Sequence, residues 1–385
     1  MKWNAFKLIE EAFSKTKERL FPFNFKDWFR LGFISALASQ KSLNFNSSFN
    51  SADLSSFSGN SGEKIKDFFR EKGLILGGIL SAFFIFYLFF SYLQSVFNFI
   101  FVDNLIEKKE VRSKGFLLKF SFLVLANVFV LALLSWPFFL LGFSTRLFIF
   151  TLAALILIEI VFLFIFISLL DLGETFKRNH SKGLSLFFFK FVISVLALAC
   201  FGALISPYLI SLWRGGSLFG VGGLYVFFSI FAAIALLIGL WIIFLFLYDF
   251  VVPYMYVKDT SCFFSWKQVW KRIWKNKLEV VVYWAARFLL GIGVGLIIIF
   301  MLVLIFLILV FIAILIFLIL YLLYFVLGNF VIVIGLLMAS ILAIIFLVIA
   351  MIVVMPFQVF FRYFGFLNFE KLTELKIFKV NKNKK

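Results

Sequence analysis

Two charged side chains lie inside long apolar runs, where they could hold a polar group or an ion. Glu159 is in the middle of LILIEIVF, and Arg287 is the only charged residue in 280–361. If these runs cross a membrane, a charge near the centre costs roughly 2.5 to 3.5 kcal/mol, so each needs a partner or must be neutral. Arg287 follows Lys277 by ten residues, which places it roughly 12 to 15 Å below the membrane surface. We therefore predict that Glu159 and Arg287 pair or line one polar cavity. The alternative is a neutral Glu159 that is hydrogen-bonded to a neighbouring helix.

A second group of candidates lies at the ends of apolar runs. Asp249 is close to Pro253 in the sequence, and Arg362 is close to Pro356. Prolines interrupt or kink helices, so these positions could form a gate or a lipid-headgroup site at the inner membrane surface. The simpler interpretation is that they anchor helices at the interface and tie them together.

Residue types that carry out catalysis are scarce. The chain has a single histidine, His180, and two cysteines, Cys200 and Cys262. We therefore predict no catalytic residues, no metal site and no cofactor. The sequence GIGVG at 291–295 could suggest a nucleotide-binding loop, but no strand precedes it and no lysine follows, so close helix packing is the favoured interpretation.

The stretch 249–277 is the widest polar interruption in the apolar second half of the chain. Within it, Trp266, Trp270 and Trp274 recur every four residues. On a helix they share one face with Val269 and Ile273. Three lysines occupy the opposite side: Lys267, Lys271 and Lys275. This pattern predicts a helix at about 262–277 in the headgroup layer, with anionic lipid as its partner at the cytoplasmic face. The alternative is the buried face of a soluble helix.

The amino-acid composition of the whole chain indicates which kind of secondary structure holds these residues. Of the 385 residues, 64% are hydrophobic, and the mean hydropathy is +1.11. These values predict an all-α, polytopic helical membrane protein, because soluble domains are roughly half apolar and only helices suit such long apolar runs. The net charge of +18 would suggest nucleic acid in a soluble protein. Here the charges flank apolar runs, so we predict no nucleic-acid partner.

The order of apolar and polar segments predicts four regions. Residues 1–39 contain an amphipathic interfacial helix and a short segment, 25–39, that crosses the membrane or dips into it. Residues 40–72 form a Ser- and Asn-rich extracytoplasmic loop, 73–365 a membrane bundle, and 366–385 a basic cytoplasmic tail. We expect about eight membrane helices, among them 117–141 and 147–170. The run 280–361 fits either two overlong helices or three shorter ones, with Gly328-Asn329 as the best turn.

The distribution of charge predicts the orientation. With the N-terminus inside and the short segment crossing, most of the 37 lysines and arginines lie in the segments assigned to the cytoplasm. Both termini are then cytoplasmic. The abundance of Phe, Lys, Asn and Ile is typical of AT-rich prokaryotic genomes, so we expect the cell membrane of a prokaryote.

Four segments spread along nearly the whole chain carry a resemblance: FPFNFKDWFRLGF, DFVVPYMY, VVYWAARFLLGI and MPFQVFFRYFGFLNFEKL. They resemble prokaryotic multi-pass proteins similar to the membrane domain of glycerophosphoryl diester phosphodiesterases. The catalytic half of those enzymes is a soluble barrel with metal-binding carboxylates and paired histidines, which this sequence does not contain. The resemblance therefore implies a membrane module without that chemistry.

Three functions remain open from the sequence. The first is a non-enzymatic membrane module that organises lipid, a partner protein or a second copy of itself. The second is a transporter or lipid-translocating protein that uses the Glu159 and Arg287 pair. The third, a membrane enzyme acting on lipids, has the least support because no acid–base or metal constellation is visible.

Overall fold

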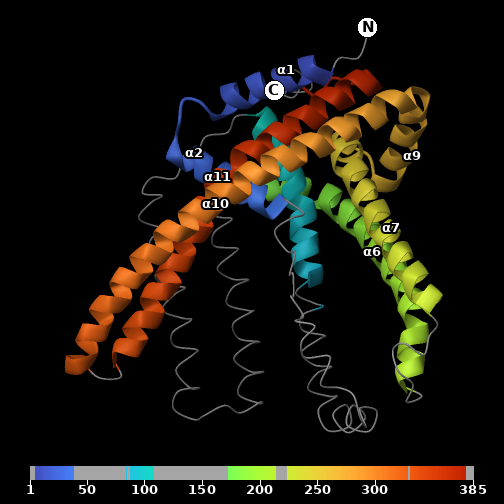
Figure 1. Ribbon diagram of the computed structural model, residues 1–385. Coiled ribbons are helices and arrows are strands. Elements are labelled where there is room, and N and C mark those ends of the chain that lie inside the picture. Colours follow the sequence, from blue (N-terminus) through green and yellow to red (C-terminus); the bar gives the residue numbers. More distant parts are fainter. Residues whose placement is uncertain are drawn as a thin grey trace.

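The computed structural model describes residues 5–38, 84, 87–107, 172–213, 223–327 and 330–378, and within these ranges the chain forms helices and no strands (Figure 1). The first part comprises α1 (Ala5–Leu20), α2 (Phe25–Ala38), an unlabelled helix (Tyr87–Ile106) and α6 (Gly173–Trp213). The second part comprises α7 (Gly223–Phe246), a π-helical turn (Leu247–Val251), α8 (Val252–Lys258), α9 (Cys262–Ile273), a 3-10 turn (Trp274–Asn276), α10 (Lys277–Leu327) and α11 (Phe330–Thr373).

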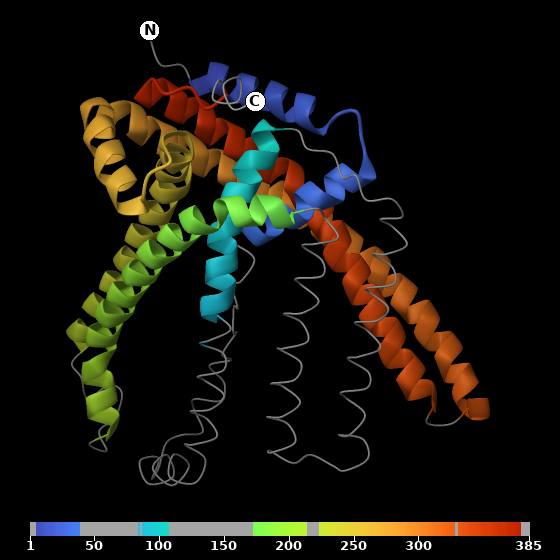
Figure 2. The ribbon, with the colours of Figure 1, turned by 180° about the vertical axis from the view of Figure 1, so that it is seen from behind.

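Five described helical stretches are long and apolar enough to cross a membrane. They are Tyr87–Ile106, Gly173–Leu204, Phe227–Lys258, Cys262–Phe325 and Ile341–Thr373. Figures 1 and 2 show that α6 pairs with α7 and α10 with α11, and that the two hairpins diverge from a common end. Large apolar side chains along α10 are exposed, as expected for helices that face lipid.

The run 280–361 forms two overlong helices instead of three shorter ones. The 51 residues of α10 correspond to a length of about 77 Å at 1.5 Å per residue, well beyond the roughly 30 Å of a hydrocarbon core. The helices end and begin on either side of Gly328-Asn329, the turn expected from the sequence. Their polar ends therefore extend into the common end of the molecule.

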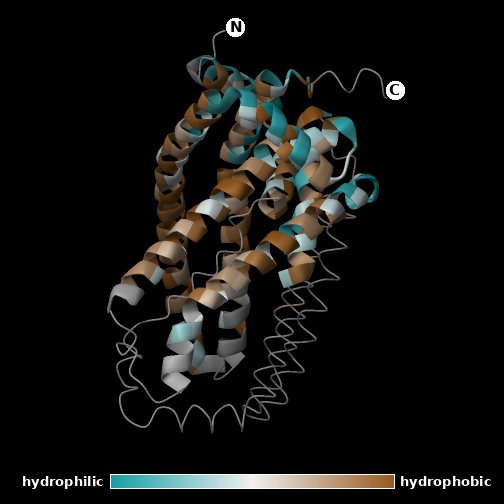
Figure 3. Cartoon of the chain, turned by 90° about the vertical axis from the view of Figure 1, so that its right-hand side faces the viewer, coloured by the Kyte–Doolittle hydropathy of each residue, from teal (hydrophilic) through white to brown (hydrophobic). Residues whose placement is uncertain are grey.

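This common end, which we call the hub, contains most of the buried core. Figure 3 shows hydrophilic residues gathered there and hydrophobic residues along the hairpins. The hub consists of α1, α2, the helix Tyr87–Ile106, the first turns of α6, residues 246–258, α9, the first turns of α10 and the last turns of α11. A buried apolar cluster runs through all of these segments, so the hub holds the hairpins in place.

Helix α1 lies across the C-terminal part of α11 (Figure 1). Its buried residues are Leu8, Ala12, Thr16 and Leu20, whereas Phe13 is 65% exposed. The small side chain of Ala12 permits close packing on another helix. Helix α2 has 14 residues, a length of about 21 Å. It is shorter than a normal membrane span.

Arginine side chains from other helices cap two helix ends in the hub. The Nε of Arg19 donates to the carbonyl of Asn104 (3.1 Å), and the hydroxyl of Tyr363 donates to the carbonyl of Leu105 (2.9 Å). Arg272 donates to the carbonyl of Thr373, the last residue of α11 (2.8 Å). The last carbonyls of a helix lack intrahelical donors and carry partial negative charge. Burial lowers the pKa of Arg19 from its ordinary value, but a guanidinium stays charged at neutral pH.

The first part of α6 crosses the helix Tyr87–Ile106 at close range (Figure 2). A β-carbon added at Gly183 would lie 2.7 Å from the Cα of Val96, so only glycine fits at this crossing. By contrast, β-carbons added at Gly291, Gly293 and Gly295 meet nothing within 4 Å among the described residues. The described helices therefore pack closely at Gly183, a position that the sequence did not single out, and not at GIGVG.

Several sequence predictions fall outside the described residues. They concern the loop 40–72, the expected spans 117–141 and 147–170, the end of the tail, and Glu159. The pairing of Glu159 with Arg287 therefore stays a prediction.

Candidate functional site

The centre of the hub is built around Asp249, which lies in the π-helical turn Leu247–Val251. The backbone N–H of Val252 bonds to the carbonyl of Leu247, a bond one residue longer than in an α-helix. Pro253 explains this widening: it lacks an N–H, and its ring would clash with the carbonyl four residues earlier, that of Asp249. Pro253 thus lies in the first turn of α8, and the π-turn sets the direction of the Asp249 side chain.

Asp249 binds Arg287 and Tyr283, two residues one turn apart on α10. The Arg287 Nη1 lies 2.6 Å from the Asp249 Oδ2, and the two side chains are 19% and 0% exposed. The Tyr283 hydroxyl donates to the same oxygen (2.9 Å) and accepts from Arg287 (2.7 Å). The sequence assigned Asp249 and Arg287 to separate groups. The structure brings them together as one ion pair between the end of the α6–α7 hairpin and α10.

Arg362 of α11 makes a second set of ties to the same turn. Its Nη1 donates to the carbonyl of Tyr248 (2.9 Å), and its Nη2 donates to the Oδ1 of Asn98 (3.0 Å). The Nδ2 of Asn98 in turn donates to the carbonyl of Ala38, the last residue of α2 (3.1 Å). A single buried guanidinium thereby connects α11, the π-turn and the helix Tyr87–Ile106, and through Asn98 it also reaches α2.

Helix α11 can approach Asp249 because residue 365 is glycine. A β-carbon at Gly365 would lie 3.2 Å from the Asp249 Oδ1 and 3.5 Å from the Arg287 Nη1. The same Oδ1 is buried and accepts no hydrogen bond from the described residues. Pro356 lies inside α11, nine residues before Gly365. Among the four inner-interface candidates, the structure therefore places Asp249 and Arg362 in the centre and the two prolines in the helices that carry them.

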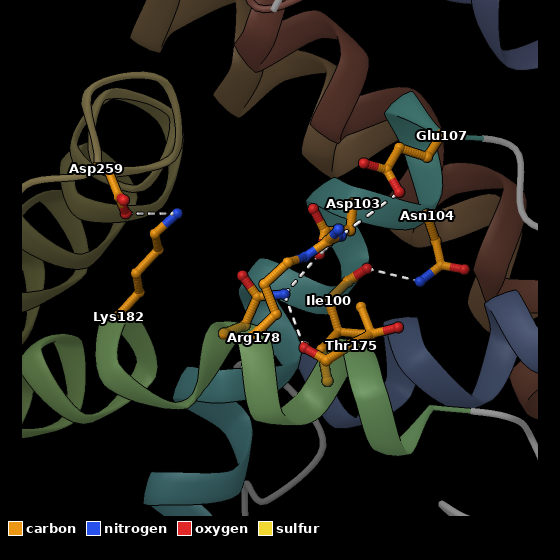
Figure 4. Close-up of polar contacts among 9 residues, drawn as sticks. Ile100, Asp103, Asn104, Glu107, Thr175, Arg178, Lys182 and Asp259 are labelled. Carbon is orange, nitrogen blue, oxygen red and sulfur yellow. Dashed lines mark hydrogen bonds and ion pairs between the residues drawn. The ribbon is translucent and has the colours of Figure 1, made fainter. Parts of the chain in front are cut away.

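A second polar cluster joins α6 to the helix Tyr87–Ile106 (Figure 4). The carboxylate of Asp103 accepts from Arg178 (2.7 Å) and from Asn179 (2.5 Å), and Arg178 also reaches Glu107 at 3.5 Å. Further along α6, buried Lys190 donates to the Gln94 side chain (2.7 Å). Sequence reasoning missed this cluster, although a lysine inside an apolar stretch was a usable signal.

Helix α9 and the 3-10 turn that follows it carry three parallel rows of side chains. The buried row faces the hub: Cys262, Ser265, Val269 and Ile273. Beside it stand the stacked rings of Trp266, Trp270 and Trp274, with centroids 6.4 and 5.2 Å apart. The outer row consists of three exposed lysines: Lys267, Lys271 and Lys275. The sequence assigned the tryptophans to the same face as Val269 and Ile273, whereas the structure places them along the edge between buried and charged rows.

The three tryptophans differ in how far they are buried. Trp266 packs against Phe246 and Phe189, with centroids 4.7 and 5.2 Å apart, while Trp270 and Trp274 are 46% and 55% exposed. Within the described residues, no group of His, Cys, Asp and Glu could hold a metal ion. The arrangement can therefore tie helices together and present an aromatic and basic surface.

The comparisons with known proteins give one match. A family model described as "Family of unknown function (DUF7544)" matches residues 3–170 and 138–375. Searches of curated proteins and of solved structures found no match.

Proposed function

The chain belongs to the DUF7544 family of unknown function, and we propose that it is a non-enzymatic integral membrane protein that organises lipid or a partner protein around its hub. The resemblance to the membrane domain of glycerophosphoryl diester phosphodiesterases agrees with this proposal, because that domain is separate from the catalytic barrel.

The observation that carries the proposal is the use of charge in the hub. Each buried charge at the centre bonds to another helical segment: Asp249 to α10, Arg287 to the π-turn, and Arg362 to the helix Tyr87–Ile106. Buried charged side chains that bond to other helices fix the relative positions of those helices. The lysines of the α9 segment are instead exposed, together with Trp270 and Trp274. A rigid centre with an outward-facing surface suits a scaffold better than a substrate channel.

In this proposed function the chain lies in the cell membrane of a prokaryote, with about eight spans and both termini in the cytoplasm. Two observations support a common side for the ends of the chain. Lys15 of α1 lies 3.8 Å above the ring of Phe378, beyond the end of α11. Both helices also belong to the hub, together with α9.

Cysteine accessibility is expected to report this topology. In a background with Cys200 and Cys262 replaced by alanine, single cysteines at Ser56, Lys271 and Lys384 are labelled with a membrane-impermeant maleimide in intact cells and in inverted vesicles. We expect Ser56 to react from outside, and Lys271 and Lys384 from the cytoplasmic side. Labelling of Ser56 and Lys384 from the same side would contradict the eight-span arrangement.

Native mass spectrometry after gentle extraction from the cell membrane tests the function itself. We expect the protein to retain a lipid class that is enriched over the bulk membrane, or a partner protein. The lipid composition of the same membrane is the control. A lipid profile identical to that of the bulk, with no co-purified protein, would contradict the proposal.

A transporter remains the second candidate because of one specific observation. The Oδ1 of Asp249 is buried in a π-turn without a donor among the described residues, and both features are frequent at functional sites. A small ion retained by the native protein and lost in Asp249→Asn would favour transport.

A further inference from the structure

We propose that the corner between α9 and α10 is a seat for one anionic phospholipid of the cytoplasmic leaflet. This inference rests on the proposed function and specifies which lipid chemistry the scaffold binds and where. The corner comprises the exposed part of α9, the 3-10 turn Trp274–Asn276 and the outer face of the first turns of α10.

Positive charge dominates this corner. Residues 262–279 contain one acid, Glu279, and five cations: Lys267, Lys271, Arg272, Lys275 and Lys277. Arg272 is bonded to the carbonyl of Thr373, whereas the four lysines are exposed. Clusters of lysine next to a membrane helix attract anionic headgroups. A lipid headgroup with a net negative charge therefore complements this surface.

The aromatic side chains of the corner determine the depth in the membrane at which the lipid headgroup binds. The Trp270 ring lies 5.7 Å from Phe246 at the end of α7, so the tryptophan row is turned toward the membrane helices and the lysine row away from them. Lys277 reaches back over the Trp274 ring at 4.2 Å. Indole rings prefer the boundary between headgroups and acyl chains, and the lysines then stand where phosphates lie.

An apolar stripe continues from the corner along α10. Leu278 is 82% exposed, followed by Val281, Val282, Phe288 and Leu289, all exposed. Continuity of a basic row, an aromatic row and an apolar stripe matches the order of a phospholipid: phosphate, glycerol backbone and acyl chain. A soluble acidic protein would use the lysines but would leave the apolar stripe uncovered.

Brominated lipids test the seat, because bromine on an acyl chain quenches nearby tryptophan fluorescence. The protein is placed in nanodiscs of phosphatidylcholine with a small fraction of either brominated phosphatidylglycerol or brominated phosphatidylcholine. In the native chain, we expect brominated phosphatidylglycerol to quench the tryptophan fluorescence more strongly than brominated phosphatidylcholine does. The Trp270→Phe, Trp274→Phe variant is expected to lose that excess, which assigns the signal to the corner.

Lysine variants test the recognition of charge. Replacing Lys267, Lys271 and Lys275 with glutamine is expected to weaken the preference for phosphatidylglycerol by roughly tenfold or more. Arginine at the same three positions is expected to preserve it, and both variants should elute as the native protein because the side chains are exposed. The matched control replaces three exposed lysines elsewhere, Lys7, Lys17 and Lys177, with glutamine and is expected to keep the native preference.

Three outcomes would overturn the seat. They are equal quenching by the two lipids in the native chain, quenching by neither, and equal loss of preference in the control variant. Such results, together with an enriched lipid or partner in native extraction, would refute only the seat. If native extraction also retains nothing, the proposed function fails as well.

Discussion

Asp249→Ala is expected to lower the free energy of unfolding by about 3 to 5 kcal/mol, because it leaves a charged Arg287 in the hub without its partner. An arginine cannot give up its proton. The reverse change, Arg287→Met, is expected to cost less, roughly 1 to 3 kcal/mol, because Asp249 can take up a proton and keep its bond to Tyr283. The two variants should therefore differ, although they break the same ion pair.

Unfolding in detergent, followed by tryptophan fluorescence, measures this asymmetry. The double variant Asp249→Ala, Arg287→Met should recover part of the loss, as a double-mutant cycle requires of coupled residues. Lys182 and Asp259 provide the control: their charged atoms are 2.9 Å apart, but Asp259 is 72% exposed. Asp259→Asn is expected to cost less than about 1 kcal/mol. Equal losses in Asp249→Ala and Asp259→Asn would show that the central pair does not stabilise the hub.

The second large effect is expected for Gly183→Ala, at the crossing of α6 and the helix Tyr87–Ile106. The new β-carbon would lie 2.4 Å from a methyl of Val96 and 2.7 Å from its Cα. A side chain can move away, but the backbone moves only with the helix. We expect a loss of about 1 to 3 kcal/mol, with weakening of the neighbouring Arg178 and Lys190 bonds.

A companion substitution separates the two sources of the clash. Val96→Ala removes the methyl and leaves the Cα in place, so it should restore only part of the stability of Gly183→Ala. Gly293→Ala is the matched control, because nothing lies within 4 Å of its added β-carbon among the described residues. Alanine in an open helical position is expected to stabilise by roughly 0.5 to 1 kcal/mol. If alanine changed the free energy of unfolding in the same direction at Gly183 and at Gly293, the close crossing would be contradicted.

Much of the architecture could be predicted from the sequence. Long apolar runs predicted helices, and the described residues are helical, with five stretches able to cross a membrane. For the run 280–361 the sequence allowed two or three helices; the structure has two, and they end and begin on either side of Gly328-Asn329. The α9 segment was recognised from its repeat of tryptophan every four residues. These successes share one cause: each depends on neighbours in the sequence.

The candidate site was only partly predictable. Asp249, Arg287 and Arg362 were all selected, because charges near or inside apolar runs are conspicuous, but their partners were not. The ion pair joins residues 38 positions apart, and the Arg362 bond to Asn98 joins residues 264 positions apart. Gly183 gave no signal, because nothing in its neighbourhood indicates which helix will cross there.

The sequence by itself determined where helices form and which parts are apolar, because backbone groups in an apolar run must bond within their own helix. Only the tertiary structure decided which charges meet. The π-turn before Pro253 shifts the register by one residue and sets the direction of Asp249, and Gly365 lets α11 approach the same carboxylate. Such contacts depend on crossing points between helices, which local composition does not specify.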